Sequence, residues 1–371
     1  MRILYWTESF WPHIGGVQVL SLPLIRALMD KGHRFLVVTS HGRGPLPDQE
    51  LVAGIEVRRF HFQGALADRS LASIRDLAGR VAELKRTFRP DLLHIHSCEP
   101  GLFFHLHTLG AGVAPVLFSL HGVPASVTEG NSLLGRALRS AHWVAACSAA
   151  VLEDILRVVP EIAPRSSVIH PGLPIPAVAP APLPFDRPLL LGLGRLVPEK
   201  GFDLALRAFS LVRERHPDVR LVVAGDGPVR GELEGLAESL GLTKEVEFAG
   251  WVAPDRVPDW INRALMLILP SRWQEPFGLV AVEAAQLARP VVAARVGGLK
   301  EIVVPGETGL LVRPGDVTEL ASAVDSLLAQ PALMREMGRK ARKRAVKAFS
   351  VDRSAAEYDR LYVRLTDGRG G

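Results

Sequence analysis

Residues 269–304 contain the stretch that decides the fold, LPSRWQEPFGLVAVEAAQLARPVVAARVGGLKEIVV. Its apolar beginning predicts a strand that ends at Pro270, and the apolar and small residues from Gly278 predict a helix. A second apolar run after Pro290 predicts another strand, which stops at the Gly297–Gly298 pair. A strand, a helix and a second strand in this order form a βαβ unit, from which parallel sheets are built.

Two acids border the start of the predicted helix. Glu275 lies in the loop before the first turn, and Glu283 lies about five residues into the helix, roughly 7 Å along its axis. The free N–H groups at a helix N-terminus attract an anion such as phosphate, and carboxylates accept hydrogen bonds from sugar hydroxyls. The pair is therefore a candidate site for a phosphate with a sugar on either side. The plainer alternative is that Glu275 stabilises the helix start and Glu283 lies on a solvated face.

The alternation of strands and helices continues over the whole chain. In the first half, strands are predicted at residues 3–7, 36–40, 55–60, 92–96, 116–120, 143–148 and 168–170. Six prolines between residues 174 and 188 predict an extended linker, after which the alternation starts again. Each half therefore predicts a doubly wound parallel α/β sheet, in which ligands bind at the carboxyl ends of the strands. A length of 371 residues suits two such domains.

Loops that follow predicted strands carry further candidate residues. Gly15 and Gly16 precede a helix, and paired glycines let backbone amides approach a ligand closely. His121 stands where a strand gives way to a loop. Arg195 and Lys200 share one loop, where a guanidinium and an ammonium can hold a diphosphate and stabilise the charge it gains on leaving. Taken singly, each feature also has a structural explanation: a turn, a structural histidine or a solvated loop.

Several of these stretches carry a family resemblance. The segment RWQEPFGLVAVEAA at 272–285 resembles the E-x7-E signature of the retaining GT-B glycosyltransferases of family 4. GRLVPEKG at 194–201 is similar to the GRLxxxKG of that family, the Gly15–Gly16 pair lies in a loop similar to its FxPxxGG, and His121 begins its HG motif. The likeness covers almost the whole chain, with a departure at 170–174, where the family usually has Asn-Gly-Val-Asp.

The resemblance implies a role for each residue. Arg195 and Lys200 would neutralise the leaving diphosphate, Glu275 and His121 would contact the donor hexose, and Glu283 would bind the ribose hydroxyls. The remaining residues contribute mainly through the backbone: Pro276, Phe277, Gly278 and Leu279 to the hexose and diphosphate, Val252 to the nucleobase, and Gly15 and Gly16 to the acceptor side.

The fold that the resemblance implies is GT-B, two facing Rossmann-like doubly wound domains with a cleft between them. On this chain it predicts an acceptor-side domain at 1–172, a linker at 173–188 and a nucleotide-sugar-binding domain at 189–350. The last segment, 351–371, resembles the terminal helix of the family that crosses back to the N-terminal domain.

The segment from Arg58 to Arg89 is basic, with eight basic residues and three acidic ones. The predicted amphipathic helix within 70–89 has a basic face, which is compatible with peripheral contact to anionic lipid headgroups as well as with a solvated surface. Nucleic acid is not an expected partner, because no binding motif is present. No apolar run reaches the roughly 20 residues of a membrane span, and the N-terminus reads as a buried strand. We therefore expect a cytoplasmic protein, with the inner membrane face as an optional location.

Neither a metal nor a cofactor is expected. The chain has no Asp-x-Asp pair, which transferases that hold the diphosphate through a divalent metal commonly need. His94 and His96 lie on one face of a strand without a convincing third ligand, so both are interpreted as structural. Cys98 and Cys147 lack metal or redox spacing and are interpreted as reduced structural thiols.

The sequence as a whole predicts a retaining, metal-independent hexosyltransferase. Its donor would be a nucleotide diphosphate sugar, a UDP- or GDP-sugar, and its acceptor a hydroxyl of a glycan or lipid-linked acceptor in cell-surface polysaccharide, cell wall or glycolipid synthesis. One alternative is a GT-B nucleotide-sugar 2-epimerase, which needs no acceptor. Another is a non-catalytic partner subunit that binds nucleotide sugars, against which stands the joint presence of His121, Arg195, Lys200, Glu275 and Glu283.

Overall fold

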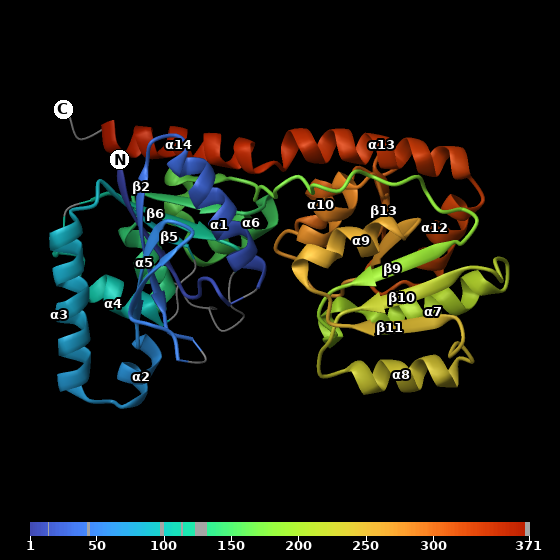
Figure 1. Cartoon of the computed structure of the whole chain (residues 1–371), viewed down its shortest axis with the longest axis horizontal. Helices are drawn as coiled ribbons and strands as arrows, with labels where there is room; N and C mark the ends of the chain where they lie inside the picture. Colours follow the sequence, from blue (N-terminus) through green and yellow to red (C-terminus); the bar gives the residue numbers. More distant parts are fainter. Residues whose placement is uncertain (14, 43–44, 97–99, 113, 123–131, 368–371) are drawn as a thin grey trace. The chain divides into compact units, whose positions relative to one another are not determined.

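The computed structural model describes residues 1–13, 15–42, 45–96, 100–112, 114–122 and 132–367. The chain folds into two compact units (Figure 1). The first consists of residues 1–172 together with the segment that begins at Val351, and the second of residues 173–350. Among the described residues, no helix has both the length and the apolar composition that a membrane span requires.

The first unit is built on one eight-stranded sheet with the order β3-β4-β2-β1-β5-β6-β7-β8. Its strands are β1 (Arg2–Thr7), β2 (Arg34–Ser40), β3 (Gln49–Val52), β4 (Ile55–Phe60), β5 (Leu92–His96), β6 (Val116–Leu120), β7 (Trp143–Ala146) and β8 (Ser166–Val168). All neighbours run parallel except the hairpin of β3 and β4. The sequence did not predict β3, because this short edge strand is mostly exposed and lacks an apolar run.

Helices cover this sheet: α1 (Gly16–Met29), α2 (Phe62–Ala67), α3 (Leu71–Phe88), α4 (Gly101–His107), α5 (Leu133–Ser140), α6 (Ala149–Val158) and α14 (Val351–Asp367), with a 3-10 turn η1 (Pro160–Arg165). Serines begin three of them, because their hydroxyls accept the backbone N–H groups of the first turn. The C-terminal helix α14 lies in the first unit, where Tyr358, Leu361 and Tyr362 pack into the core formed by β1, β2 and α1.

The second unit has a six-stranded sheet in which every neighbouring pair is parallel. Its strands are β9 (Leu189–Leu193), β10 (Arg220–Ala224), β11 (Val246–Gly250), β12 (Met266–Leu269), β13 (Val291–Ala294) and β14 (Gly309–Val312), in the order β11-β10-β9-β12-β13-β14. The chain moves outward from β9 in both directions, so right-handed crossovers place its helices on opposite faces of the sheet. The hydrophobic core of this unit includes residues from its strands and from α7, among them Leu190, Phe202, Phe209, Leu221 and Ile268.

The helices of the second unit are α7 (Phe202–Arg213), α8 (Arg230–Ser239), α9 (Val257–Asn262), α10 (Leu279–Gln286), α11 (Leu299–Ile302), α12 (Val317–Leu328) and α13 (Pro331–Ala348), with the 3-10 turns η2 (Pro198–Lys200) and η3 (Pro254–Arg256). The direction of the strand order reverses between β9 and β12, which is the topological switch point where doubly wound sheets bind ligands. Both units are therefore the doubly wound α/β folds that the sequence predicts.

Several predicted strand bounds were wrong. The strand predicted at 143–148 ends at Ala146, and the one predicted at 168–170 lies at Ser166–Val168. The strand after Pro290 ends at Ala294, three residues before the glycine pair that was expected to stop it. Gly297 instead lies in the turn that leads into α11, with a left-handed φ of 46°. A Cβ atom there would lie 1.9 Å from the backbone oxygen of Glu275, so this position requires glycine because another loop passes against it.

Candidate active site

The candidate site of the second unit is formed by the loops that leave β9 and β12. These strands are neighbours at the switch point, with Leu191 paired to Leu267, so the loops after them begin side by side. The first loop carries Arg195 and Lys200, and the second carries Glu275 and leads into α10. The predicted charged residues thus come from adjacent strand ends.

Lys200 and Glu275 form the centre of this site. The Lys200 ammonium donates to Glu275 Oε1 over 2.6 Å, and Ser271 Oγ donates to the same oxygen over 2.6 Å. Glu275 is only 6% exposed, whereas the Lys200 side chain is 24% exposed. Two donors on one nearly buried carboxylate oxygen fix its orientation, and the ammonium keeps access to solvent.

Further contacts hold the two loops together. Arg272 binds the Asp203 carboxylate on α7 through both terminal nitrogens and donates its backbone N–H to the carbonyl of Glu199 over 2.8 Å. The hydrogen bond from Arg272 lowers the pKa of Asp203. Gly201 has a left-handed φ of 68°, and a Cβ atom there would lie 2.2 Å from the carbonyl oxygen of Pro270. The loops therefore approach one another at a distance that only glycine allows.

The start of α10 is fixed by the chain around it. Gly278 precedes the helix with a left-handed φ of 114°, and a Cβ atom there would meet the Leu299 side chain at 2.6 Å. Phe277 is buried against the ring of Phe349 at 5.6 Å between centroids. Pro276, Phe277, Gly278 and Leu279 thus run directly from Glu275 into the first turn of the helix, where backbone N–H groups point toward the loop.

The other predicted residues of this unit lie further from the ion pair. Glu283 is in the second turn of α10, partly buried, and burial raises its pKa to about 7. No hydrogen bond to its carboxylate is found within the described part of the chain. Arg195 is exposed two residues after β9 and has no ion pair with a described residue. Val252 is partly buried two residues after β11.

In the first unit, His121 follows β6 and pairs with His96, the last residue of β5. Their Nε2 atoms lie 2.9 Å apart and their ring centroids 4.4 Å apart. Burial lowers the pKa of His121 to about 4, and burial with the neighbouring His121 lowers the pKa of His96. Both rings are therefore neutral near pH 7, with one nitrogen donating and the other accepting. The sequence pattern indicated a structural role for His96 and did not predict this pair.

His94 has the structural role that was expected for it. Its Nδ1 lies 2.6 Å from the hydroxyl of Tyr362, and its Nε2 lies 2.7 Å from Ser119 Oγ, which in turn lies 3.0 Å from the hydroxyl of Tyr358. The network joins α14 to β5 and β6 beside His121. A signal was present in the sequence, because Ser119 interrupts an apolar strand and the two tyrosines lie four residues apart on one helix face.

The glycines of the first loop lie at the start of α1. Gly15 precedes this helix in an extended conformation, and its carbonyl accepts the N–H of Val19 over 3.0 Å. Gly16 is the exposed first residue of the helix. The structure thus puts both glycines in the position the sequence predicts, a turn into a helix after a strand.

Two residues of the basic stretch between Arg58 and Arg89 are buried, which the sequence pattern did not predict. Lys85 is buried under α3 and donates to Thr108 Oγ1 over 2.8 Å, and burial lowers its pKa to about 7. Arg59 is buried on β4 and pairs with Glu50. Cys147 is buried, and Cys98 lies outside the described residues.

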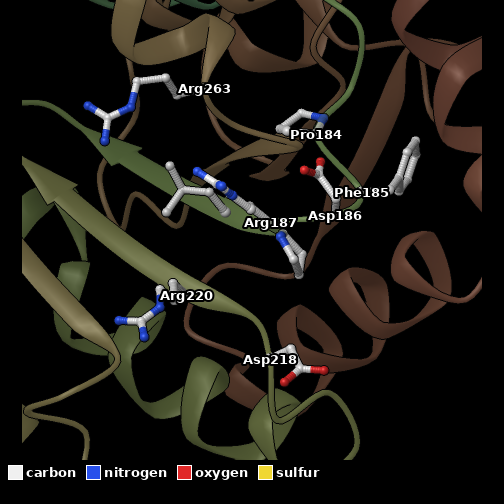
Figure 2. Close-up of a pocket in the computed structure, with 9 residues that line it drawn as sticks. Pro184, Phe185, Asp186, Arg187, Asp218, Arg220 and Arg263 are labelled. Carbon is white, nitrogen blue, oxygen red and sulfur yellow. The ribbon is translucent and has the colours of Figure 1, made fainter.

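A cavity of about 620 Å³ lies elsewhere in the second unit. Its lining includes the start of β9 and the start of β10, with Arg187, Arg220 and Arg263 around it (Figure 2). Those are the amino ends of the strands, whereas Lys200 and Glu275 follow the carboxyl ends. This cavity is therefore separate from the candidate site.

Comparison with known proteins defines the family. Residues 179–344 match the family of glycosyl transferases group 1, and residues 14–175 match glycosyltransferase family 4. The chain is 30% identical over 387 residues to D-inositol 3-phosphate glycosyltransferase 2 of Catenulispora acidiphila, covering 94% of this chain and 90% of that protein. It is 28% identical over 408 residues to glycogen synthase of Mycobacterium tuberculosis, covering 99% and 96%.

A solved structure agrees with this assignment. The crystal structure of Anabaena HepE in complex with UDP matches with a TM-score of 0.81 at 24% identity, covering 98% of this chain and all of the other. The fold is therefore GT-B. The chain belongs to the group 1 glycosyltransferases of family 4.

Proposed function

We propose that this glycosyltransferase moves a hexose from a nucleotide diphosphate sugar to a hydroxyl group, with retained configuration and without a metal. The observation that carries the proposal is the buried Glu275 carboxylate, held by Lys200 and Ser271 directly before α10. A cation beside a helix N-terminus suits a diphosphate, and a fixed carboxylate suits sugar hydroxyls.

Each residue then has a defined task. Lys200, the exposed Arg195 and the first amides of α10 neutralise the charge that the diphosphate gains as it leaves. Glu275 and the backbone from Pro276 to Leu279 hold the hexose, and Glu283 binds the ribose. The backbone at Val252 meets the nucleobase, His121 donates to a hexose hydroxyl, and the loop with Gly15 and Gly16 shapes the acceptor site.

The reaction that fits these residues is a displacement on one face of the sugar. The bond between the anomeric carbon and the phosphate oxygen breaks, the acceptor oxygen bonds to that carbon, and the leaving phosphate oxygen takes the acceptor proton. A covalent route would need a carboxylate that can attack the anomeric carbon. Glu275 is poorly suited to that role, because Lys200 and Ser271 both donate to one of its oxygens. His121 is neutral at pH 7 and can donate a hydrogen bond without transferring a proton.

The donor and acceptor classes extend the proposal. The Anabaena structure holds UDP, which supports a UDP-sugar as donor, with a GDP-sugar as the alternative. As acceptor we propose a glycan or lipid-linked molecule of cell-surface polysaccharide or glycolipid synthesis. Exposed arginines of α3 and its C-cap, Arg75 and Arg89 among them, would contact anionic headgroups at the inner membrane face.

The test is calorimetric titration with UDP, GDP and ADP without added metal, on the wild type and on Glu283→Ala. We expect one nucleotide to bind tightly and to lose affinity in the variant, whereas Glu307→Ala, which removes an exposed acid of the same unit, leaves it unchanged. If none of the three nucleotides binds, the proposed donor site is overturned.

Product analysis completes the test. Nuclear magnetic resonance of the product should show the anomeric configuration of the donor, and an inverted product would exclude the same-face displacement. Conversion of the donor sugar without any acceptor would identify a 2-epimerase instead. Sedimentation with anionic vesicles tests the membrane contact, which Arg75→Gln with Arg89→Gln should weaken by about 1 kcal/mol per residue.

A further inference from the structure

Three side chains that play no part in the proposed reaction meet at the carboxyl edge of the first sheet. His41 directly follows β2 and His61 directly follows β4. These strands are parallel neighbours with Ser40 paired to Phe60, so the residues that come next lie side by side. Asp48 directly precedes β3, the antiparallel partner of β4, and its carbonyl accepts the N–H of Arg59 over 2.7 Å. The register of three strands thus brings the side chains together.

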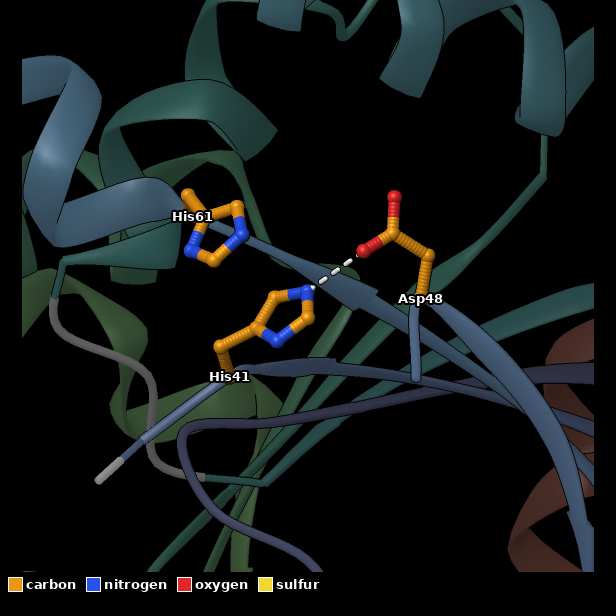
Figure 3. A group of neighbouring side chains, drawn as sticks. All are labelled: His41, Asp48 and His61. Carbon is orange, nitrogen blue, oxygen red and sulfur yellow. Dashed lines mark hydrogen bonds and ion pairs between the residues drawn. The ribbon is translucent and has the colours of Figure 1, made fainter. Parts of the chain in front are cut away.

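The three side chains are close enough to coordinate one metal ion. His41 Nε2 lies 2.8 Å from Asp48 Oδ1, and the rings of His41 and His61 are stacked at 3.7 Å between centroids (Figure 3). One nitrogen or oxygen atom of each residue lies within 4.8 Å of those of the other two. Metal–ligand bonds of about 2.0 to 2.2 Å place tetrahedral ligand atoms about 3.4 Å apart, so the three side chains are near enough to reach one ion.

We propose that His41, Asp48 and His61 bind a zinc ion, with water completing a tetrahedral site. Two imidazoles and a carboxylate are a common zinc donor set. An ion lies in the plane of each imidazole that binds it, so the stacked rings have to turn apart. His61 can do this, because it is exposed and its ring has no hydrogen bond to a described residue. His41 is 7% exposed and is already oriented by Asp48.

The charges around the cluster set the affinity. Within the described part of the chain, two cations oppose a metal ion. Arg80 lies 3.5 Å from Asp48 Oδ2, but it is half exposed and can move away. Arg59 is buried and compensated by Glu50. The ring of His13 also lies near the cluster, with its Nε2 3.3 Å from the backbone carbonyl oxygen of His41.

A zinc ion here would stabilise the first unit and would not take part in transfer. It would connect the ends of β2 and β4 to the chain before β3, all in the unit that does not contain Lys200 and Glu275. The proposal therefore does not rest on the proposed reaction, and binding rather than activity tests it.

The experiment is calorimetric titration of the chelator-treated protein with zinc alone. We expect one site in the wild type and at least about a 100-fold loss of affinity in both His61→Ala and Asp48→Ala, because each removes a ligand. Both positions are exposed, and circular dichroism will show that the variants fold. His107→Ala removes an exposed histidine of the same unit and should bind zinc like the wild type.

Two further measurements sharpen the result. Cobalt bound at the site should give the strong visible absorption of tetrahedral coordination, which both ligand variants should lack. Zinc should raise the Tm of the wild type and of His107→Ala, but not of His61→Ala. The proposal is overturned if the wild type does not bind zinc, or if either ligand variant keeps the wild-type affinity.

Discussion

The carboxyl edges of the two sheets have the same architecture but different chemistry. In the second unit the loops at this edge carry an ion pair, Lys200 with Glu275, and the exposed cation Arg195. In the first unit the same edge carries histidines: His41, His61, His96 and His121. A doubly wound sheet thus fixes where side chains of a site lie, whereas the residues that follow each strand decide whether that edge stabilises charge or offers neutral donors.

Burial acts on the two edges in opposite directions. It raises the pKa of Glu283 to about 7 and lowers the pKa of His121 to about 4, because a poorly solvated site disfavours the charged form of either group. Near pH 7 the acid therefore exchanges a proton and the histidine does not. The two edges should respond differently to mutation and to pH.

The largest losses of activity should follow from substitutions of the ion pair Lys200 and Glu275 at the carboxyl edge of the second sheet. Lys200→Ala and Glu275→Gln should each lower kcat by about 10²- to 10³-fold, since in the proposed mechanism each removes a contact that holds or neutralises the reacting groups. Steady-state kinetics with the donor found by titration measures this. Lys244→Ala and Glu307→Gln, which change exposed residues of the same unit, serve as controls. Near-normal turnover in both site variants would remove the ion pair from the mechanism.

A smaller loss is expected at the neutral edge. His121→Ala should lower kcat by about 10- to 100-fold, the value of one hydrogen bond made in the transition state. Because the pKa of His121 is about 4, its ring stays neutral above pH 5, and the pH profile of kcat should keep its shape in the variant. A profile that loses an ionisation near neutrality on substitution would show that His121 titrates and would contradict its assignment as a neutral donor.

The smallest effect concerns Glu283, where binding and stability should change in opposite directions. In its proposed role Glu283 accepts ribose hydroxyls as a carboxylate, which forms only above its pKa of about 7, so nucleotide affinity in the wild type should fall as the pH drops through 7. Glu283→Gln should bind about 10-fold more weakly at pH 8 and lack this pH dependence. Calorimetry between about pH 6 and pH 8 distinguishes the two proteins.

The same pKa determines the sign of the stability change. A carboxyl whose folded pKa exceeds its unfolded value stabilises the fold below the unfolded pKa and loses that contribution as the pH rises through 7. Glu283→Gln should therefore raise the free energy of unfolding at pH 8 by at most about 3 kcal/mol. Chemical denaturation at pH 5 and pH 8 measures it. An equal change at both values would show that ionisation is not the cause.

Local patterns predicted the parts of the fold that depend on apolar runs. β5 and β6 have the predicted bounds, and α10 begins directly after Gly278. Edge β3 was missed because exposed residues give no apolar signal, and the end of β13 was misplaced because Gly297 serves a contact with Glu275, which lies far away in sequence. The pattern cannot show which distant chain passes against a glycine.

The same limit applies to individual side chains. The basic stretch gave no indication that Lys85 and Arg59 point inward, since that depends on Thr108 and Glu50 being near them in the folded unit. The pairing of His96 with His121 was also missed. It required β5 and β6 to be neighbours, which the order of strands in the sheet decides.

By itself the sequence determined the alternation of strands and helices, the restart of that alternation after the prolines, and the family, through motifs that stay within a few residues of one another. Only the tertiary structure decided which strand ends are adjacent, and with them the contacts of Lys200 with Glu275, of His96 with His121 and of His41 with Asp48. The reason is physical. Secondary structure follows from local periodicity and backbone preference, whereas contacts between side chains depend on strand order and register, which are set by packing over the whole sheet.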